Sequence, residues 1–250
     1  MNKATITGPI DRFLRETSPM VRIIVILNVV IFAIPYLLDQ LGVVYKTVAV
    51  SELLLIYGAK DNIAIASADQ YYRFLTMMFL HGNIVHLLFN SFAIVQIGVT
   101  VERMSDSKRF LGIYFIGGFM GGVASYLFSA NPSVGASGAI FALIGAMGTF
   151  VWMNRSAYGA NAKQILASIV FTALINIFFG FSMQNIDNMA HIGGLLGGLV
   201  TGFFLMPRLT EQLTESGLVR LRTPLSWGWN ATIALTAVLF VVVAVSIPAL

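Results

Sequence analysis

Long apolar segments alternate with shorter polar segments along most of the chain. Each apolar run is about as long as a helix must be to cross a hydrocarbon core of about 30 Å, and a helix satisfies its own backbone hydrogen bonds inside a bilayer. The predicted transmembrane helices cover residues 20–38, 77–100, 110–128, 134–153, 163–181, 188–206 and 229–247. The pattern therefore predicts an all-α polytopic membrane protein with seven spans.

The polar segments complete the predicted organisation. Residues 1–19 precede an apolar run that is too long for a signal-peptide core, so we expect an uncleaved first span. The segment 39–76 holds an apolar patch and an aromatic cluster around Arg73, and we expect it to lie partly in the membrane interface, which such side chains prefer. The expected units are an N-terminal segment 1–19, a helical core 20–206, a linker 207–228 and a last helix within 229–250.

The positions of Lys and Arg predict the orientation of the chain in the membrane. Twelve of the fifteen precede or open the first span or follow the second, fourth and sixth spans, whereas three lie in 39–76 and none in the other loops. Short cytoplasmic loops carry the excess of positive charge. We therefore expect residues 1–19 and 207–228 to be cytoplasmic and the C-terminus to face the outside, in a multi-pass protein of the cell membrane.

Composition narrows the function classes. The chain is 57% hydrophobic and 10% charged, whereas soluble domains have about 45–50% apolar and about 25% charged residues. Because it has no cysteine, disulfides, a thiolate nucleophile and cysteine-ligated metal sites are excluded. No span core carries an Asp or Glu of the kind that proton-coupled transporters use, which weakens a transporter function. The small net charge of +4 gives no reason to expect nucleic acid binding.

One serine requires an explanation. Ser137 lies in a glycine-rich turn that opens an apolar helix, Gly138–Met153. At 1.5 Å per residue this helix is about 24 Å long, so we expect it to begin below the membrane surface. Its first N–H groups have no helical partners and favour developing negative charge, so a hydroxyl there lies beside a half-built oxyanion hole. The alternative is that Ser137 only caps the helix. The string GASGA is not the G-x-S-x-G elbow of α/β-hydrolases.

Other polar side chains enter the spans at the same end as Ser137. His81, His86 and Asn90 open the second span from outside, and His191 opens the sixth. His86 and Asn90 are four residues apart and share a helix face, whereas His81 would lie about 140° from His86. Each group could instead make only a helix–helix hydrogen bond, worth about 0.6 kcal/mol on average. A zinc site built from the three histidines is a further alternative, disfavoured by this spacing and by the absence of an HExxH motif.

Two stripes of mostly small residues predict close packing of the fourth and sixth spans. The stripes comprise Ser137, Phe141, Gly145 and Gly148 on one helix and His191, Gly194, Gly198 and Gly202 on the other. Small residues let helix backbones approach closely, which would bring Ser137 to His191. A serine within hydrogen-bond reach of an imidazole is an activated nucleophile.

The surroundings of this pair follow from the same pattern. Phe141, one turn below Ser137, could stack on the imidazole ring. Asp187 precedes the sixth span by one residue and is expected to cap it, so the pattern favours a Ser–His dyad over a triad. Gly193 and Gly197 lie on the neighbouring stripe, where we expect an added methyl group to be tolerated better than on the stripe of His191.

These motifs resemble those of the rhomboid intramembrane serine proteases. The resemblance rests on HGNIVHLLFN with His81, His86 and Asn90, on GASG with Gly135, Ser137 and Gly138, and on AHIGGLLGG with His191, Gly194 and Gly198. Shorter supporting strings are YGAK at 57–60, YRFLT at 72–76 and VER at 101–103. Together they cover about residues 20–206, and the last span resembles the extra C-terminal helix of the six-plus-one members. The implied fold is a six-helix bundle plus one transmembrane helix.

The resemblance also implies a function and a set of roles. Ser137 would be the nucleophile and His191 the base, with His86, Asn90 and the backbone N–H groups of Ser137 and Gly138 stabilising the oxyanion. His81, Gly135, Phe141, Gly194 and Gly198 would support the site. The implied reaction is cleavage of single-pass membrane proteins near the outer end of their transmembrane helix, with no cofactor and no metal. The expected partners are these substrates and membrane lipids. The alternative is a catalytically silent relative that binds membrane clients.

Overall fold

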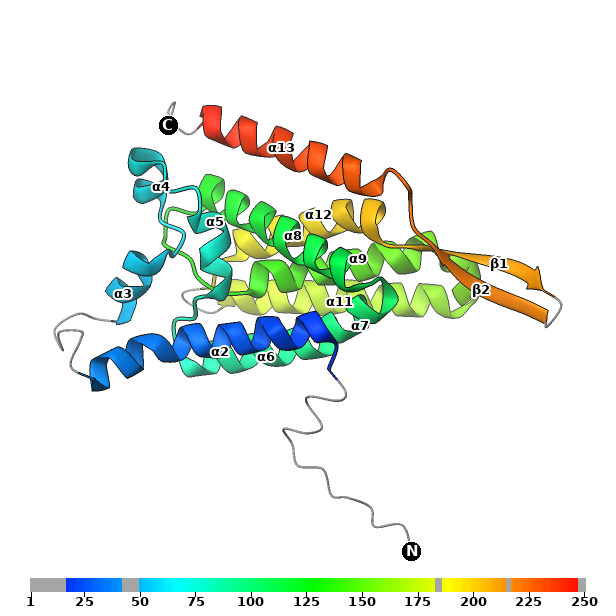
Figure 1. Cartoon of the computed structure of the whole chain (residues 1–250), viewed down its shortest axis with the longest axis horizontal. Helices are drawn as coiled ribbons and strands as arrows, with labels where there is room; N and C mark the ends of the chain where they lie inside the picture. The colour runs from blue at the N-terminus through cyan, green and yellow to red at the C-terminus, as the bar shows by residue number, and fades with distance from the viewer. Residues whose placement is uncertain (1–16, 42–49, 183–185, 215–216, 247–250) are drawn as a thin grey trace, which may run out of the picture.

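The computed structural model describes residues 17–41, 50–182, 186–214 and 217–246 of the chain. Helices packed side by side form the body, and one hairpin of two strands projects from one end of it (Figure 1). The predicted all-α polytopic fold is confirmed. Five helices are long and apolar enough to cross a membrane, and two shorter apolar helices, Pro19–Pro35 and Ser137–Met153, accompany them.

The long helices lie at the predicted spans. They are α2 (Pro19–Gln40), α6 (Ile84–Ala93) continued by the π-helical turn η2 (Ile94–Gly98) and α7 (Val99–Met104), α8 (Ser107–Phe128), α9 (Ser137–Met153), α11 (Asn161–Ser182), α12 (Asn188–Leu205) and α13 (Gly228–Ser246). The shorter elements are α3 (Val50–Tyr57), α4 (Asn62–Ala68), α5 (Arg73–Thr76), η1 (Met77–Phe79), α10 (Arg155–Tyr158), β1 (Arg208–Thr214) and β2 (Gly217–Thr223).

The second span begins later than predicted. A 3-10 turn, η1, ends before Leu80, which has extended backbone angles, and α6 begins only at Ile84. Asn83 caps α6 by accepting a hydrogen bond from the backbone N–H of His86 over 2.8 Å. His81 therefore precedes the helix, and the angle expected between His81 and His86 on a common helix is wrong. An Asn in the N-cap position is the signal that could have located this start.

Helix α12 lies between α8 and α9 and makes its most extensive contacts with both (Figure 1). Glycines permit this on both of its faces. A Cβ atom on Gly198 would overlap the carbonyl oxygen of Ala142 in α9, and one on Gly193 would overlap Ala124 in α8. Gly193 therefore also has little room for a methyl group, because two neighbouring helices use adjacent stripes of α12. That it tolerates one better than the stripe of His191 stays a prediction.

A buried carboxylate joins three elements at the opposite end of the bundle from Ser137. Glu102 in α7 accepts hydrogen bonds from the backbone N–H groups of Met20 and Val21 over 3.2 and 3.1 Å, and from the hydroxyl of Ser107 over 2.6 Å. It thereby supplies the N-terminal partners that α2 lacks within its own chain segment. The string VER thus fixes the start of α2 against α7 and α8.

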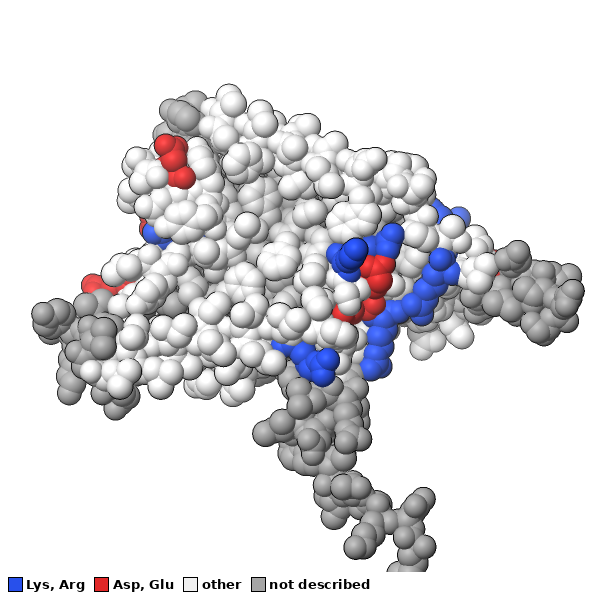
Figure 2. Space-filling view, in the orientation of Figure 1, with Lys and Arg blue, Asp and Glu red and all other residues white. Residues whose placement is uncertain are grey.

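The linker 207–228 contains structure that we did not predict. Strands β1 and β2 pair antiparallel from Arg208 opposite Thr223 to Thr214 opposite Gly217. The described Lys and Arg side chains visible in Figure 2 gather mainly near the end of the bundle from which this hairpin departs. In Figure 1, α13 then returns along the side of the bundle opposite to α2.

Candidate active site

Ser137 is the first residue of α9, and its side chain does not cap the helix. The N-cap position belongs to Ala136, without a side-chain hydrogen bond. The hydroxyl Oγ of Ser137 lies 2.9 Å from Nε2 of His191. The alternative in which Ser137 serves only as a cap is therefore wrong, and the half-buried hydroxyl is hydrogen-bonded to an imidazole at the start of α12.

A stacked aromatic ring holds the imidazole of His191. The rings of Phe141 and His191 have centroids 4.4 Å apart and lie 15° from parallel. His191 is only 7% exposed, and its Nδ1 has no hydrogen-bond partner among the described residues. The ring is thus oriented by stacking and by Ser137, with Nε2 directed at the hydroxyl.

The nearby carboxylate is engaged elsewhere. Asp187 caps α12 by accepting a hydrogen bond from the backbone N–H of Ala190 over 3.0 Å, as predicted, and it also accepts one from the hydroxyl of Ser125 in α8. Neither bond involves His191. Within the described part of the chain, the site is geometrically a pair, Ser137 and His191, without a carboxylate on the imidazole.

Backbone contacts set the distance between the two helices that carry the pair. A Cβ atom on Gly194, one turn after His191, would overlap the carbonyl oxygen of Gly138, the residue after Ser137. Gly145 likewise faces the backbone of α12 at Leu195. Gly148, expected on the same stripe, instead faces α11, where an added Cβ would meet only Cγ2 of Ile169 at 3.6 Å. Gly148 therefore lies off the face that α9 shares with α12, although that face continues to Thr149, which is hydrogen-bonded to Leu199.

Gly135 brings the second histidine to the serine. Its φ of +130° is a conformation that side chains rarely adopt, and a Cβ there would lie 2.8 Å from the ring of His86 and 3.7 Å from Oγ of Ser137. His86 therefore lies against the turn that carries the serine. The ring of His81 packs edge-on against His86, with centroids 5.1 Å apart. No group of three or more His, Asp and Glu in the described ranges is arranged to hold a metal ion.

Asn90 is directed differently from the other predicted donors. It is 5% exposed, and its Nδ2 donates a hydrogen bond to the carbonyl oxygen of His86 over 3.0 Å, within its own helix. The backbone N–H groups of Ser137 and Gly138 lie in the first turn of α9, which has no preceding turn to accept them. These N–H groups and the ring of His86 therefore lie near Ser137, whereas the amide of Asn90 is engaged within its own helix.

Comparison with known proteins identifies the architecture. A family model for the rhomboid domain matches residues 68–208, which is more than half of the 250 residues. The chain belongs to the rhomboid family. It is 45% identical over 148 residues to "Rhomboid protease GluP" of Bacillus subtilis (strain 168), covering 59% of this chain and 28% of that protein.

Plant rhomboids are similar over a comparable region. "RHOMBOID-like protein 4" of Arabidopsis thaliana is 37% identical over 152 residues, which is 60% of this chain and 38% of the relative. "RHOMBOID-like protein 6, mitochondrial" of the same organism is 35% identical over 175 residues, 70% of this chain and 55% of the relative. This rhomboid therefore spans between about a quarter and about half of the length of these relatives.

The first loop of this rhomboid contains a buried lysine, Lys60, whose contacts no pattern in the sequence predicts. Nζ of Lys60 donates hydrogen bonds to Oδ1 of Asn62 over 2.9 Å and to the carbonyl oxygens of Ser129 and Asn131, both over 2.8 Å. The ammonium group thus ties the first loop to the segment between α8 and α9. Burial lowers the pKa of Lys60 to about 8, and Asp187 opposes that shift.

Arg73 connects two parts of the same loop, α5 and the C-terminal end of α3. Its Nη1 donates to the carbonyl oxygens of Leu55 over 2.6 Å and Ala59 over 2.8 Å, which lie at and beyond the end of α3. Thr76 donates from Oγ1 to the carbonyl oxygen of Gly58 over 2.7 Å. The strings YGAK and YRFLT therefore form one hydrogen-bonded unit.

Proposed function

We propose that this rhomboid is an intramembrane serine endopeptidase in which Ser137 is the nucleophile and His191 the general base. The observation that carries the proposal is the 2.9 Å contact between Oγ of Ser137 and Nε2 of His191. A hydroxyl is a weak nucleophile until an adjacent base accepts its proton. The stacked Phe141 supports the proposal because it holds the imidazole ring in the orientation in which Nε2 reaches the serine hydroxyl.

The proposed reaction follows the logic of acyl transfer. Oγ of Ser137 attacks the scissile carbonyl carbon while Nε2 of His191 takes the hydroxyl proton, and negative charge develops on the carbonyl oxygen. The first N–H groups of α9 and the ring of His86 stabilise that charge. The C–N bond then breaks as the protonated His191 gives its proton to the leaving amine, and a water molecule, activated by His191, hydrolyses the acyl-enzyme.

The proposed substrates are single-pass membrane proteins cut near the outer end of their transmembrane helix. Ser137 opens a helix of 17 residues, which at 1.5 Å per residue is shorter than a hydrocarbon core of about 30 Å. The site therefore lies below the membrane surface at the end opposite to the Lys- and Arg-rich loops. With those loops cytoplasmic, the reacting pair faces the outer leaflet.

The experiment is cleavage of a panel of single-pass proteins by the protein reconstituted in vesicles, with fragments identified by mass spectrometry. Ser137→Ala and His191→Ala are each expected to lose cleavage completely while keeping the helical circular dichroism of the unsubstituted protein. Turnover is expected to persist in EDTA, because the proposed chemistry uses no metal. Cleavage by both variants at the original rate would overturn the proposal.

A catalytically silent rhomboid that binds membrane clients is the second candidate. The presence of both reacting side chains in hydrogen-bond contact argues against it. The same panel separates the two functions, because a silent relative would retain single-pass proteins through detergent purification and would leave every one of them uncut.

A further inference from the structure

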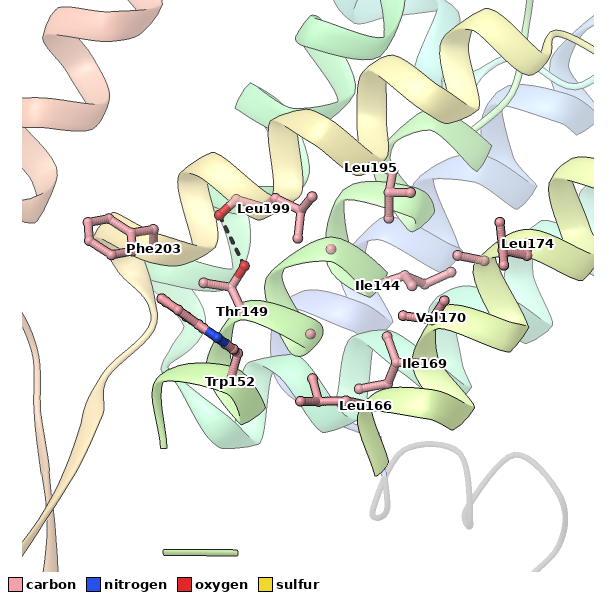
Figure 3. Close-up of a pocket in the computed structure, with 13 residues that line it drawn as sticks. Ile144, Thr149, Trp152, Leu166, Ile169, Val170, Leu174, Leu195, Leu199 and Phe203 are labelled. Atoms are coloured by element: carbon pink, nitrogen blue, oxygen red, sulfur yellow. Dashed lines mark hydrogen bonds between the residues drawn. The ribbon is translucent and has the colours of Figure 1, made fainter. Parts of the chain in front are cut away.

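A groove lies between α9, α11 and α12, on the side of the bundle away from α8. Its volume is about 410 Å³, within the range of small-molecule sites. Thirteen residues line it, and almost all of the lining is carbon (Figure 3). The hydroxyl of Thr149 donates to the carbonyl oxygen of Leu199 over 3.1 Å and so is already satisfied. The groove therefore offers an apolar channel along three membrane-spanning helices.

One end of this groove is cationic. Figure 3 shows Trp152 and Phe203 together at one end and Leu174 towards the other. The guanidinium carbon of Arg155 lies 5.6 Å from the ring centroid of Trp152, and that of Arg208 lies 5.6 Å from the ring centroid of Phe203. Two lining aromatic rings thus each carry an arginine at the end where α9 and α12 finish.

A buried amide fixes the two arginines to the same place. Asn154, adjacent to Arg155, donates from Nδ2 to the carbonyl oxygen of Pro207 over 3.2 Å and accepts from the backbone N–H of Leu209 over 2.6 Å. Pro207 and Leu209 flank Arg208. Asn154 is 3% exposed, so this connection is shielded from competing solvent. The positions of Arg155 and Arg208 therefore result from one built contact between the ends of α9 and α12.

A third cation belongs to the same end, and the helices around it supply no neutralising charge. Lys163 is exposed in the first turn of α11, three residues before Leu166, which lines the groove, and residues three apart share a helix face. The sequence contains no Asp or Glu between Asp106 and Asp187, nor in α12. Lys163 is the one charged residue in the three helices that form the groove.

We propose that this groove binds one anionic glycerophospholipid, with an acyl chain along α11 and the phosphate at Arg155, Arg208 and Lys163. The surrounding bilayer is itself hydrocarbon, so the apolar lining gives little preference among lipids. The cationic end supplies the selectivity, as basic pockets between transmembrane helices do for anionic headgroups. By the distribution of Lys and Arg, this end lies in the cytoplasmic leaflet. The site is separate from Ser137 and does not depend on the proposed proteolysis.

Trp152 provides a direct test, because its side chain lines the groove and is 52% exposed. The chain has three tryptophans, and a variant carrying Trp227→Phe and Trp229→Phe keeps only Trp152. It is reconstituted in phosphatidylcholine vesicles in which either the phosphatidylcholine or a minor fraction of phosphatidylglycerol is brominated on its acyl chains. We expect brominated phosphatidylglycerol to quench Trp152 well beyond its share of the bilayer.

Charge variants sharpen the test. Arg155→Ala and Lys163→Ala are each expected to lower the preference for phosphatidylglycerol by about fivefold, the ratio that corresponds to about 1 kcal/mol per basic residue. Lys108→Ala removes the same charge from an exposed position at the start of α8, and it is expected to leave the preference unchanged. An equal loss in Lys108→Ala would mean a general surface potential and would overturn the proposal.

Two other quenching results would overturn the lipid proposal. Equal quenching by the two lipids at equal fractions means no headgroup selectivity, and protection of Trp152 from both means that protein, such as a second copy of the chain, covers the groove. Either result overturns the proposal. If the tryptophan variant fails to fold, native mass spectrometry of the unsubstituted protein replaces it. The expected result is one retained phosphatidylglycerol, lost in Arg155→Ala and kept in Lys108→Ala.

Discussion

The helices α8 and α12 and the helix α11 are all apolar, yet they are packed in opposite ways. In the most apolar window of each helix, 61% of α8 and 56% of α12 is buried, against 11% of α11. The tightly packed helices meet through glycines, such as Gly121, where an added Cβ would lie only 2.7 Å from the carbonyl oxygen of Ala190. Helix α11 instead exposes large side chains, including Phe171 and Phe178 at 66% and 64%.

This difference separates two kinds of constraint on the sequence. Between α8, α9 and α12 the backbones themselves are in contact, so the geometry of Ser137 and His191 cannot change without moving a helix. On the side of α11 the chain leaves a groove and many lipid-facing positions. The cleavage rate is therefore expected to fall when even a small side chain is added between α8, α9 and α12. It is expected to change little when a large side chain is removed from the outer face of α11.

The largest expected effect comes from adding volume to the packed region. In Gly194→Val and Gly198→Val the new side chain would overlap the carbonyl oxygens of Gly138 and Ala142, and a shift of about 1 Å can cost on the order of 100-fold in rate. We expect loss of cleavage together with a lower melting temperature in detergent.

Gly194→Ala and Gly148→Ala are a matched pair that adds one methyl group on and off the shared face, respectively. Gly148 lies on α9 but faces α11, where an added Cβ has ordinary contact distance, so cleavage by Gly148→Ala is expected to stay within a few-fold of the original rate. Full activity in Gly198→Val would contradict the packing of α12 on α9.

The next effect concerns stabilisation of the oxyanion. His86→Ala is expected to lower kcat by roughly 10²–10³, about 2.7–4 kcal/mol, as for other single oxyanion-hole donors. Asn90→Ala is expected to lower kcat by a smaller factor, because the amide of Asn90 donates to the carbonyl oxygen of His86 within its own helix. Steady-state kinetics on one substrate decides between them, and a change confined to KM in His86→Ala would indicate a role in binding alone.

A smaller effect is expected where the first loop meets the packed region. The folded-state pKa of Lys60 is about 8, against an ordinary value of 10.5, so between these values the unfolded chain binds more protons than the folded chain. The free energy of unfolding, relative to that of Lys60→Met, should therefore rise as the pH increases from about 8 to 10.5. Denaturant titrations of both proteins across this pH range provide the measurement. If the free energy of unfolding depends on pH in the same way in both proteins, the lowered pKa of Lys60 is refuted.

The smallest effect is expected on the outer face of α11. Phe171→Ala and Phe178→Ala remove exposed side chains, so each should change the free energy of unfolding by no more than about 0.5 kcal/mol. Cleavage rates should remain close to the original in the same vesicles. A loss comparable to that of Gly194→Val would mean that α11 is held as tightly as the other helices, and it would remove the contrast between the two regions.

The sequence predicted the parts of this fold that depend on periodicity. The spans, the meeting of Ser137 with His191, the stacking of Phe141 and the cap at Asp187 follow from helical spacing and from the residues that cap helices. The spans and the cap depend on neighbours a few residues apart, which a single sequence shows directly. The contact of Ser137 with His191 joins two helices, and the stripe of mostly small residues on each helix was the signal for it.

Other contacts between distant segments were not predicted, because no motif or stripe marked both partners. The tight fit of Gly193 depends on Ala124 in α8, and the direction of Gly148 depends on Ile169 in α11. Lys60 is buried because carbonyl groups about 70 residues later in the chain surround it. The hairpin of β1 and β2 lies in a polar segment, and the pattern of long apolar runs gives no sign of it.

The central claim is that Ser137 is a nucleophile activated by His191, and labelling with a fluorophosphonate probe tests it most directly. The probe is applied to the unsubstituted protein, Ser137→Ala and His191→Ala in vesicles, and the site of labelling is located by mass spectrometry. The account predicts a single adduct on Ser137, absent from Ser137→Ala and nearly absent from His191→Ala. Labelling that is equal in all three proteins, or an unlabelled folded protein, would contradict it.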